Sequence, residues 1–332
     1  WQSLFAGIEE AFYPYSSCIP PGTCSLQWAL LDNEKVSEVL YSAAEARFSA
    51  KAEQFRHISA QSGFSQALYQ EFFAGLGFAN NRTPFRELAL HCSLDLLSSF
   101  SDLEKRRAIL FGFAGFLADP TRDPVQVAFR PILLRYWQLW WESGFKPLSL
   151  IWKSSGSRPF NSCHRRLQSG ILWLEKINYD PDSWLQNVIK QATSVKDLHK
   201  LLLDYPSGDA LWRKSKDFCS PLRVEGVLLG KARAKDLALN ILLPAAYSRE
   251  EQERGESSPK AKLIKDAWLQ LSPGQENHLL KEAIHRFLIP PSRAKEILKK
   301  AALQQGLIDI YQKFCLALGY DCPNCPFVIV GE

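Results

Sequence analysis

Apolar side chains recur at helical spacing over most of the chain, and the clearest run lies between Asp32 and Gly63. Residues three or four positions apart share one face of an α-helix. Here that face consists of Val36, Leu40, Ala44, Phe48, Ala52 and Phe55. The pattern predicts a long amphipathic helix that begins at Asp32 or Asn33.

Capping residues and prolines place further helix starts in the N-terminal half. Ser65 is a favoured N-cap residue, Thr83-Pro84 puts a proline at the start of a helix, and residues 101–104 form a capping box. Asp123-Pro124 is expected to open a strongly aromatic helix that Gly144 ends. Within that helix, Pro131 predicts a kink.

The C-terminal half shows the same periodicity with longer polar connections. Asn161 or Ser162 is expected to cap one helix and Ser194 another. The charged stretch 249–262 is expected to form an exposed linker. The other expected segments are a polar loop at 153–161, an irregular region at 204–223, helices at 234–246, 263–271, 275–288 and 292–314, and a strand-like segment at 327–330.

These patterns predict an all-α protein, an irregular multi-helix bundle with a Cys-rich C-terminal tail and at most a minor β-ribbon. The polar loop separates an N-terminal helical half, 1–152, from a C-terminal half, 153–332, which we expect to pack as one unit. The chain begins with Trp1 and contains no Met. We therefore expect it to be a fragment, a processed form or part of a longer chain, and the lack of Met leaves open the alternative that Met residues are missing from the sequence.

Composition narrows the class of protein. A chain of 332 residues with 46% hydrophobic content can bury a sizeable core. Its net charge of +5 permits a nucleic-acid partner without demanding one. The longest uncharged apolar stretch, 108–118, is too short to cross a bilayer, and no signal peptide is visible. These features predict a cytoplasmic protein with no membrane association.

The C-terminal cysteines are the strongest candidate for chemistry. Cytosolic thiols stay reduced, so clustered cysteines suggest a metal site. Cys315, Cys322 and Cys325 lie where the last helix ends, and the Cys-x-x-Cys turn lets two thiolates face one ion. Cys24, or Cys18 as an alternative, is expected to supply the fourth thiolate. Four thiolates suit either Zn or an iron–sulfur cluster. Ordinary packed or surface thiols remain the alternative interpretation.

No familiar catalytic signature is present, so whether the chain is an enzyme stays open. A basic loop offers a binding site instead. Arg158 and Asn161 precede a helix whose first turn carries Arg165 and Arg166. Cations there oppose the helix dipole, so either a buried carboxylate or an external anion such as phosphate should compensate them. Arg82, in a second polar turn, is a further anion-binding candidate.

Several of these segments resemble an uncharacterised bacterial family, the domain of unknown function 2851. The similar positions are Gly77–Phe85 with Leu88-Ala89, Phe111–Leu117, Arg158-Pro159 with Asn161 and Arg166-Leu167, Asn240 with Pro244, and Tyr311 with the three tail cysteines. The chain departs from the family pattern at Ser162-Cys163, where a proline is usual, and in the spacing before Cys24. Longer members carry an additional N-terminal segment that looks like a restriction-endonuclease core.

The resemblance implies a helical, non-catalytic part of a nucleic-acid-processing, nuclease-like protein. By analogy with nuclease families that use a trio of tail cysteines and one distant cysteine, it also implies an iron–sulfur cluster as a structural staple. Two alternatives stay open. One is a helical scaffold that binds a protein partner through its Trp-rich helix, and the other is an enzyme whose cleft forms only on folding.

Overall fold

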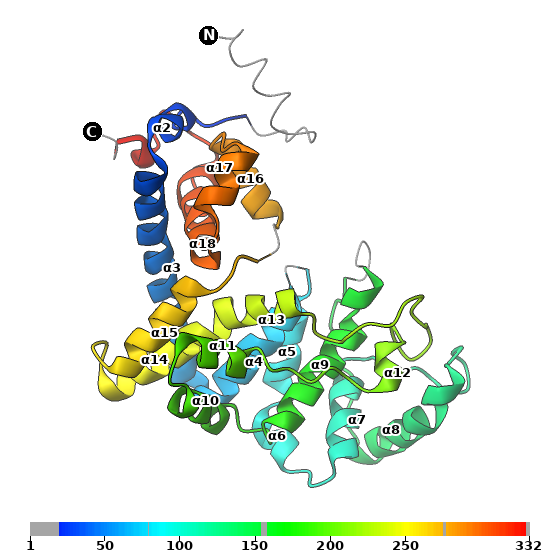
Figure 1. Ribbon diagram of the computed structural model, residues 1–332. Helices are drawn as coiled ribbons and strands as arrows, with labels where there is room; N and C mark the ends of the chain where they lie inside the picture. The colour runs from blue at the N-terminus through cyan, green and yellow to red at the C-terminus, as the bar shows by residue number, and fades with distance from the viewer. Residues whose placement is uncertain (1–19, 79, 154–157, 275–276, 330–332) are drawn as a thin grey trace. The chain divides into compact units, whose positions relative to one another are not determined.

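The computed structural model describes residues 20–78, 80–153, 158–274 and 277–329 (Figure 1). Helices make up 67% of the model, and the described residues form no sheet, only an isolated bridge between Ser215 and Pro221. The predicted all-α fold is confirmed. The strand-like segment is a correction, because Pro326–Ile329 forms a 3-10 turn and residue 330 lies outside the described ranges.

Contacts divide the chain into two compact units. The first unit comprises Trp1–Glu53 and Lys262–Glu332, and the second comprises Gln54–Ala261. The halves expected from the sequence are not these units, since the boundary at 152–153 falls inside the second unit. The polar loop at that point is therefore an internal loop of one unit.

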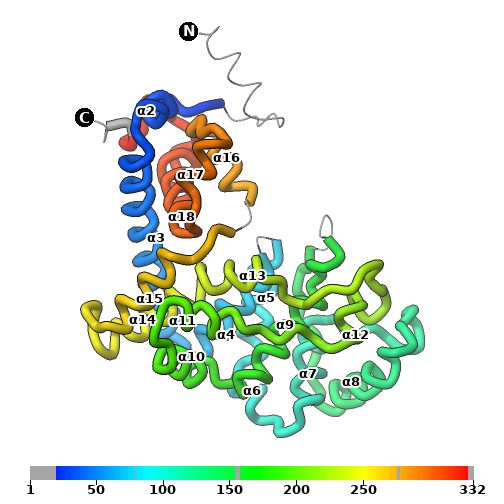
Figure 2. Tube along the Cα trace, in the orientation of Figure 1, coloured from blue at the N-terminus to red at the C-terminus, as the bar shows by residue number. Residues whose placement is uncertain are grey.

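In the first unit, the start of one long helix packs against helices from the C-terminal end of the chain. Its helices are α2 (Ser25–Leu30), the first part of α3 (Asn33–Ser62), most of α15 (Pro259–Gln270), α16 (His278–Arg286), α17 (Pro291–Ile297) and α18 (Ala301–Ile310), followed by a π-helical turn at Tyr311–Leu316. Figures 1 and 2 show α3 running beside α18, and a Cβ on Gly306 would lie 2.0 Å from the Leu40 carbonyl oxygen. The absence of a side chain at Gly306 therefore permits this close helix contact.

The second unit is built around α4 (Phe64–Leu76), most of whose residues are buried. Its other elements include the last part of α3, α5 (Arg82–His91), α6 (Leu94–Ser98), α7 (Leu103–Phe113), α8 (Arg130–Ser143), α9 (Cys163–Lys176), α10 (Pro181–Gln191), α11 (Val195–Leu202), α12 (Ala210–Arg213), α13 (Lys231–Leu237), a π-helical turn (Ala238–Leu242) and α14 (Leu243–Arg254). Helices α5, α9, α10 and the π-helical turn all contact α4. Phe72 of α4 stacks on Trp173 of α9 at 3.7 Å between ring centroids.

Several local predictions are confirmed, and the differences have clear causes. The long helix α3 starts at Asn33, Ser162 and Ser194 cap α9 and α11, and Gly144 ends α8 in a left-handed conformation. Ser65 is not an N-cap, because α4 begins at Phe64 with Gly63 as its N-cap, two residues earlier than predicted. Pro131 does not kink α8 either. It lies in the first turn, where the missing N–H has no helical partner to lose.

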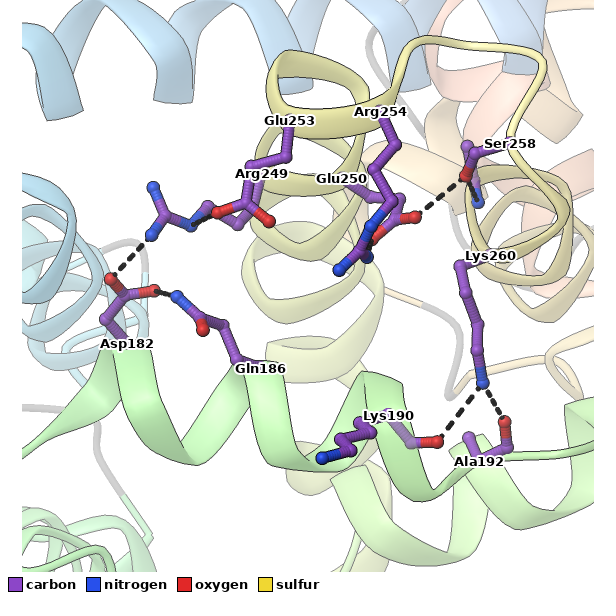
Figure 3. A network of polar contacts seen from close by, with 11 residues as sticks. Asp182, Gln186, Lys190, Ala192, Arg249, Glu250, Glu253, Arg254, Ser258 and Lys260 are labelled. Atoms are coloured by element: carbon purple, nitrogen blue, oxygen red, sulfur yellow. Dashed lines mark hydrogen bonds and ion pairs between the residues drawn. The ribbon is translucent and has the colours of Figure 1, made fainter.

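The charged stretch 249–262 is not an exposed linker, which corrects the sequence prediction. Helix α14 continues through Pro244 to Arg254, and α15 starts at Pro259. Glu250 is only 2% exposed and accepts hydrogen bonds from Arg254 and Ser258. Figure 3 shows this network facing α10, where Arg249 pairs with Asp182 at 3.0 Å. Some charges of this stretch, above all that of Glu250, are therefore used in packing, while residues 252–257 are exposed.

The C-terminal helical prediction also changes. Instead of one helix at 292–314, the chain forms α17 and α18 with a break between Ile297 and Ala301. No helix among the described residues is long and apolar enough to cross a membrane.

Candidate functional site

Four cysteine side chains gather around one buried arginine in the first unit. They are Cys24, Cys315, Cys322 and Cys325, and are called the thiol cluster below. The arginine is Arg286, the last residue of α16, which is 1% exposed. Sequence reasoning missed Arg286, because nothing in its neighbourhood along the chain points to the cysteines.

Contacts with Arg286 bring the cysteines together. Its Nη2 donates to the sulfur of Cys322 at 2.8 Å, and its guanidinium also hydrogen-bonds Cys315. A Cβ built on Gly22 would lie 3.3 Å from both Arg286 Nε and the sulfur of Cys24. Cys24, at the start of α2, is thus placed beside the C-terminal tail. Cys18, the alternative fourth ligand, lies outside the described residues.

Arg286 also ties the two chain segments that carry these cysteines. Its Nη1 donates to the Pro20 carbonyl, and its Nη2 reaches the Tyr320 carbonyl at 3.4 Å. Nε is buried and finds no hydrogen-bond acceptor. Within the described part of the chain, no carboxylate forms an ion pair with this guanidinium. A buried cation without an anion is costly, so the thiols around it are the groups that could carry the balancing charge.

Burial acts on the thiols as well. The pKa of Cys24 is raised to about 12, first by burial and then by the other three thiols of the cluster, while Arg286 opposes the shift. Burial likewise raises the pKa of Cys315, and the hydrogen bond from Arg286 lowers it. Without a further cation, these groups are neutral thiols at pH 7. A bound metal ion deprotonates the cysteines that ligate it.

The cluster therefore offers four thiols, and Arg286 donates a hydrogen bond to one of them, but the sulfur atoms are not placed at ligand distances. In the ranges that the structure describes, no group of three or more Cys, His, Asp or Glu side chains is placed as metal ligands. The residues nevertheless fit a metal–thiolate centre chemically, since N–H···S bonds from buried donors stabilise ligating sulfurs. Which metal they would hold stays open between Zn and an iron–sulfur cluster.

The basic loop in the second unit differs from its expected form. Arg165 is 0% exposed, so its guanidinium is not available to the external anion that the sequence allowed for. Its two terminal nitrogens donate to four backbone carbonyls, those of Trp212, Ser215, Gly226 and Val227. The compensating groups are peptide dipoles from the irregular region after α11. Neither a carboxylate nor an external anion is needed there.

Arg166 is buried too, but far fewer of its donors are used. It is 8% exposed and lies over the ring of Phe78, 4.0 Å from the ring centroid. Its Nη1 reaches the Gly77 carbonyl at 3.3 Å, and its Nε has no acceptor. Burial lowers the pKa of Arg166 to about 10, which still leaves it charged at neutral pH.

The remaining anion-binding candidates lie nearer the surface. Arg158 is exposed and has no ion-pair partner among the described residues, and Asn161 is partly buried in a 3-10 turn. Arg82 pairs with Glu71 at 2.8 Å, and Arg86 shares the same carboxylate. A single carboxylate thus balances two arginines.

Asn81 joins the two loops that the sequence singled out separately. Its side-chain amide donates to the Lys153 carbonyl at 2.9 Å and its oxygen accepts the Lys153 N–H at 2.8 Å. The turn that starts α5 therefore lies beside the chain that leads into the basic loop.

The comparisons with known proteins identify the family but no function. Residues 13–277 match the family described as a protein of unknown function, DUF2851. Neither the curated proteins nor the solved structures include a match. The matched range includes Cys24 and the basic loop but ends before Arg286 and the tail cysteines. The chain belongs to the DUF2851 family.

Proposed function

We propose that this chain is a helical, non-catalytic part of a nucleic-acid-processing protein, and that the thiol cluster holds a metal ion or iron–sulfur cluster that staples its first unit. The observation that carries the metal site is the buried Arg286 guanidinium among four thiols. A tetrathiolate centre places negative charge where this cation has none from a carboxylate.

The staple would join segments far apart in sequence. Cys24 lies at the start of α2, and the other three ligands lie at and beyond the end of α18. Binding free energy at such a site is available only when both segments are in place, so it contributes to folding. When bound, the metal supplies this cross-link and a charge partner for Arg286. The chain's own residues supply the ligands, the N–H···S bond and the surrounding apolar packing.

Metal content of anaerobically purified protein tests this site. The expected result is one zinc ion per chain, or iron with sulfide and the visible absorption of a cluster. Cys322→Ser should lose most of the metal. Cys219→Ser is the matched control, because Cys219 is a free thiol of the second unit and not a member of the thiol cluster. Metal-free wild-type protein, or full metal content in Cys322→Ser, would contradict the proposal.

The nucleic-acid part of the proposal is supported by the resemblance to a family whose longer members carry a nuclease-like segment, and by the basic residues around the loop at 153–161. Phosphate contacts release counterions, so affinity should fall steeply as salt rises. Fluorescence anisotropy of labelled single- and double-stranded oligonucleotides over a salt series measures this. Absence of binding at low salt would end this part of the proposal and leave the metal site untouched.

One feature favours the alternative of a protein-interaction scaffold. Val127, Leu134 and Trp141 recur at seven-residue spacing along the aromatic helix and the turn before it, and they are 83%, 56% and 79% exposed. Such a stripe of exposed apolar side chains marks many interaction surfaces. Binding to a defined protein partner that survives high salt and is lost in Trp141→Gln would favour the scaffold.

A further inference from the structure

Two arginines of the second unit share a single aromatic ring. Arg166 comes from α9 and Arg233 from α13, and the guanidinium groups of both lie over the ring of Phe78. Phe78 follows Gly77 at the end of α4 and is 37% exposed. An aromatic face attracts a cation only weakly. The ring therefore cannot replace the hydrogen bonds that two guanidinium groups require.

Several N–H groups of this pair have no acceptor. The Nε of Arg166 is buried and unbonded, and so are Nε and Nη2 of Arg233. Arg233 uses Nη1 in an ion pair with Asp236 at 3.3 Å, while Arg166 makes only its long bond to the Gly77 carbonyl. Buried donors without acceptors destabilise a folded protein. Other arginines of the described chain also have a buried, unbonded Nε, but here three such donors of two arginines lie beside one ring, where one bound oxyanion could accept from both side chains.

The charges at this place are also unbalanced. Two cations face one carboxylate, and burial lowers the pKa of Arg233 to about 9 while the nearby Arg166 lowers it as well. Burial raises the pKa of Asp236, and Arg233 opposes that shift. Both arginines remain protonated at pH 7. The local net charge is therefore positive inside a largely buried environment.

The neighbouring Arg165 forms more hydrogen bonds than Arg166. It is equally deep in the protein, yet backbone carbonyls take up both of its terminal nitrogens. Adjacent residues on a helix point in different directions. The Nε of Arg165 is buried without an acceptor, as that of Arg166 is, but the protein supplies four carbonyls to the terminal nitrogens of Arg165 and only the distant Gly77 carbonyl to those of Arg166.

The turn that carries Phe78 covers these donors. Phe78 has a positive φ of 56°, which is unfavourable for an aromatic residue, and Gly77 has its ideal Cβ position 2.1 Å from the Asn81 carbonyl oxygen. The turn is therefore closely packed against the start of α5. The partly exposed Phe78 ring is the side chain of this turn that lies over both guanidinium groups.

We propose that Arg166 and Arg233 bind a phosphate-type oxyanion, with Phe78 as the side chain that covers the site. Guanidinium N–H groups match the oxygens of phosphate in geometry and charge, and such charge-assisted bonds are the strong ones. Free phosphate and a nucleic-acid phosphodiester share this chemistry. The inference deepens the nucleic-acid part of the proposed function and does not depend on the metal site.

Isothermal titration calorimetry with inorganic phosphate tests the site directly. Arg233→Gln should weaken phosphate binding by roughly tenfold or more, because charge-assisted bonds are removed. Arg122→Gln is the matched control, since the Arg122 side chain is 86% exposed and pairs only with Asp119, its neighbour in sequence. Wild-type protein that does not bind phosphate, or an Arg233→Gln protein that binds it as tightly as wild type, would overturn the proposal.

A second variant covers the case in which Arg233→Gln does not fold. Phe78→Ala keeps both arginines and removes the covering ring, so it should bind phosphate several-fold more tightly than wild type. Unchanged or weaker phosphate binding by a folded Phe78→Ala protein would contradict the role assigned to the ring.

Titration with a labelled single-stranded oligonucleotide then distinguishes the source of the phosphate. A parallel loss of oligonucleotide and phosphate binding in Arg233→Gln supports a nucleic-acid ligand. Phosphate binding that depends on Arg233, without any oligonucleotide binding, keeps the oxyanion site and refutes the nucleic-acid part of the proposed function.

Discussion

Replacing Arg165 with Met tests whether this residue is a structural anchor. The side chain is fully buried in α9 and bonds carbonyls at both ends of the irregular segment 212–227. Met has a similar length and can fill part of the space without a charge. The substitution therefore removes the hydrogen bonds while keeping some of the packing.

The expected loss of stability follows from the number of stranded acceptors. Bonds from a charged donor contribute about 1.5–3 kcal/mol each. Two of the carbonyls left behind belong to the buried residues Trp212 and Ser215, and the other two belong to the less buried Gly226 and Val227. Part of this is offset, because the desolvation of a buried cation is no longer required. We expect Arg165→Met to lower the free energy of unfolding of the second unit by about 3–5 kcal/mol.

Urea unfolding followed by circular dichroism and Trp fluorescence measures this loss. The two compact units need not unfold together, so the transition that reports on the second unit should move while the other stays in place. Hydrogen exchange of amides in 212–227 should also accelerate, because these residues lose their link to α9. Arg122→Met on the exposed surface is the matched control and should change stability by less than about 0.5 kcal/mol.

A loss below about 1 kcal/mol in Arg165→Met would refute this reasoning. So would an effect on phosphate binding at unchanged stability, because that result would restore the anion-binding role that burial excludes for Arg165. The same experiment therefore separates a structural arginine from a ligand-binding one.

Three further predictions concern other parts of the chain. Gly306→Ala should destabilise the first unit by about 2–4 kcal/mol in urea unfolding, because the added Cβ would lie 2.0 Å from the Leu40 carbonyl oxygen. This loss should exceed the gain from the better helix propensity of Ala. A more stable variant would contradict the close helix contact. Burial lowers the pKa of His164 to about 4 from 6.5, so the unfolded chain binds a proton that the native protein does not. Stability should be full above about pH 6.5 and fall by about 1.4 kcal/mol per pH unit below it. His164 stacks on Phe116, and His164→Phe should reduce this slope. Persistence of the slope in the variant would count against buried His164 as its source. Chelation of metal-loaded protein should increase exchange of amides in α18 before those of α4, whereas equal exchange in both helices would argue against a staple in the first unit.

Much of the fold could be predicted because its signals are local. The long helix α3 is visible in the spacing of Val36 and Leu40, and Ser162 and Ser194 cap helices as their side-chain chemistry predicts. The helical structure of the charged stretch 249–262 could not be predicted in the same way. Its charges looked solvated from the sequence, yet Glu250 is buried because Arg254 and Ser258 satisfy it in the folded chain. Hydrogen bonds and ion pairs of this kind allow a charged side chain to be buried in a helix that the sequence pattern shows only as polar.

The break between α17 and α18 could not be predicted from the spacing of apolar residues either. Apolar spacing continues through the segment, so periodicity alone gives one helix from 292 to 314. In the fold, the Ala301 N–H instead bonds the Leu271 carbonyl at the end of α15. A tertiary hydrogen bond thus outweighs a local preference that carries only tenths of a kcal/mol per residue.

The two candidate sites also differ in how much of each could be predicted from local sequence. The sequence suggested Cys322 and Cys325 as metal ligands, because a thiol can ligate a metal wherever it lies and the spacing of the two residues fits a tight turn. The role of an arginine depends on its partners, and those of Arg286 are Pro20 and Tyr320, segments that only the fold brings near it. Arg165 and Arg166 make the point most sharply, since they are neighbours in one helix turn with the same charge. A structural arginine differs from a ligand-binding one in the number of hydrogen-bond acceptors that the folded chain places around its guanidinium. That number can be read only from the structure.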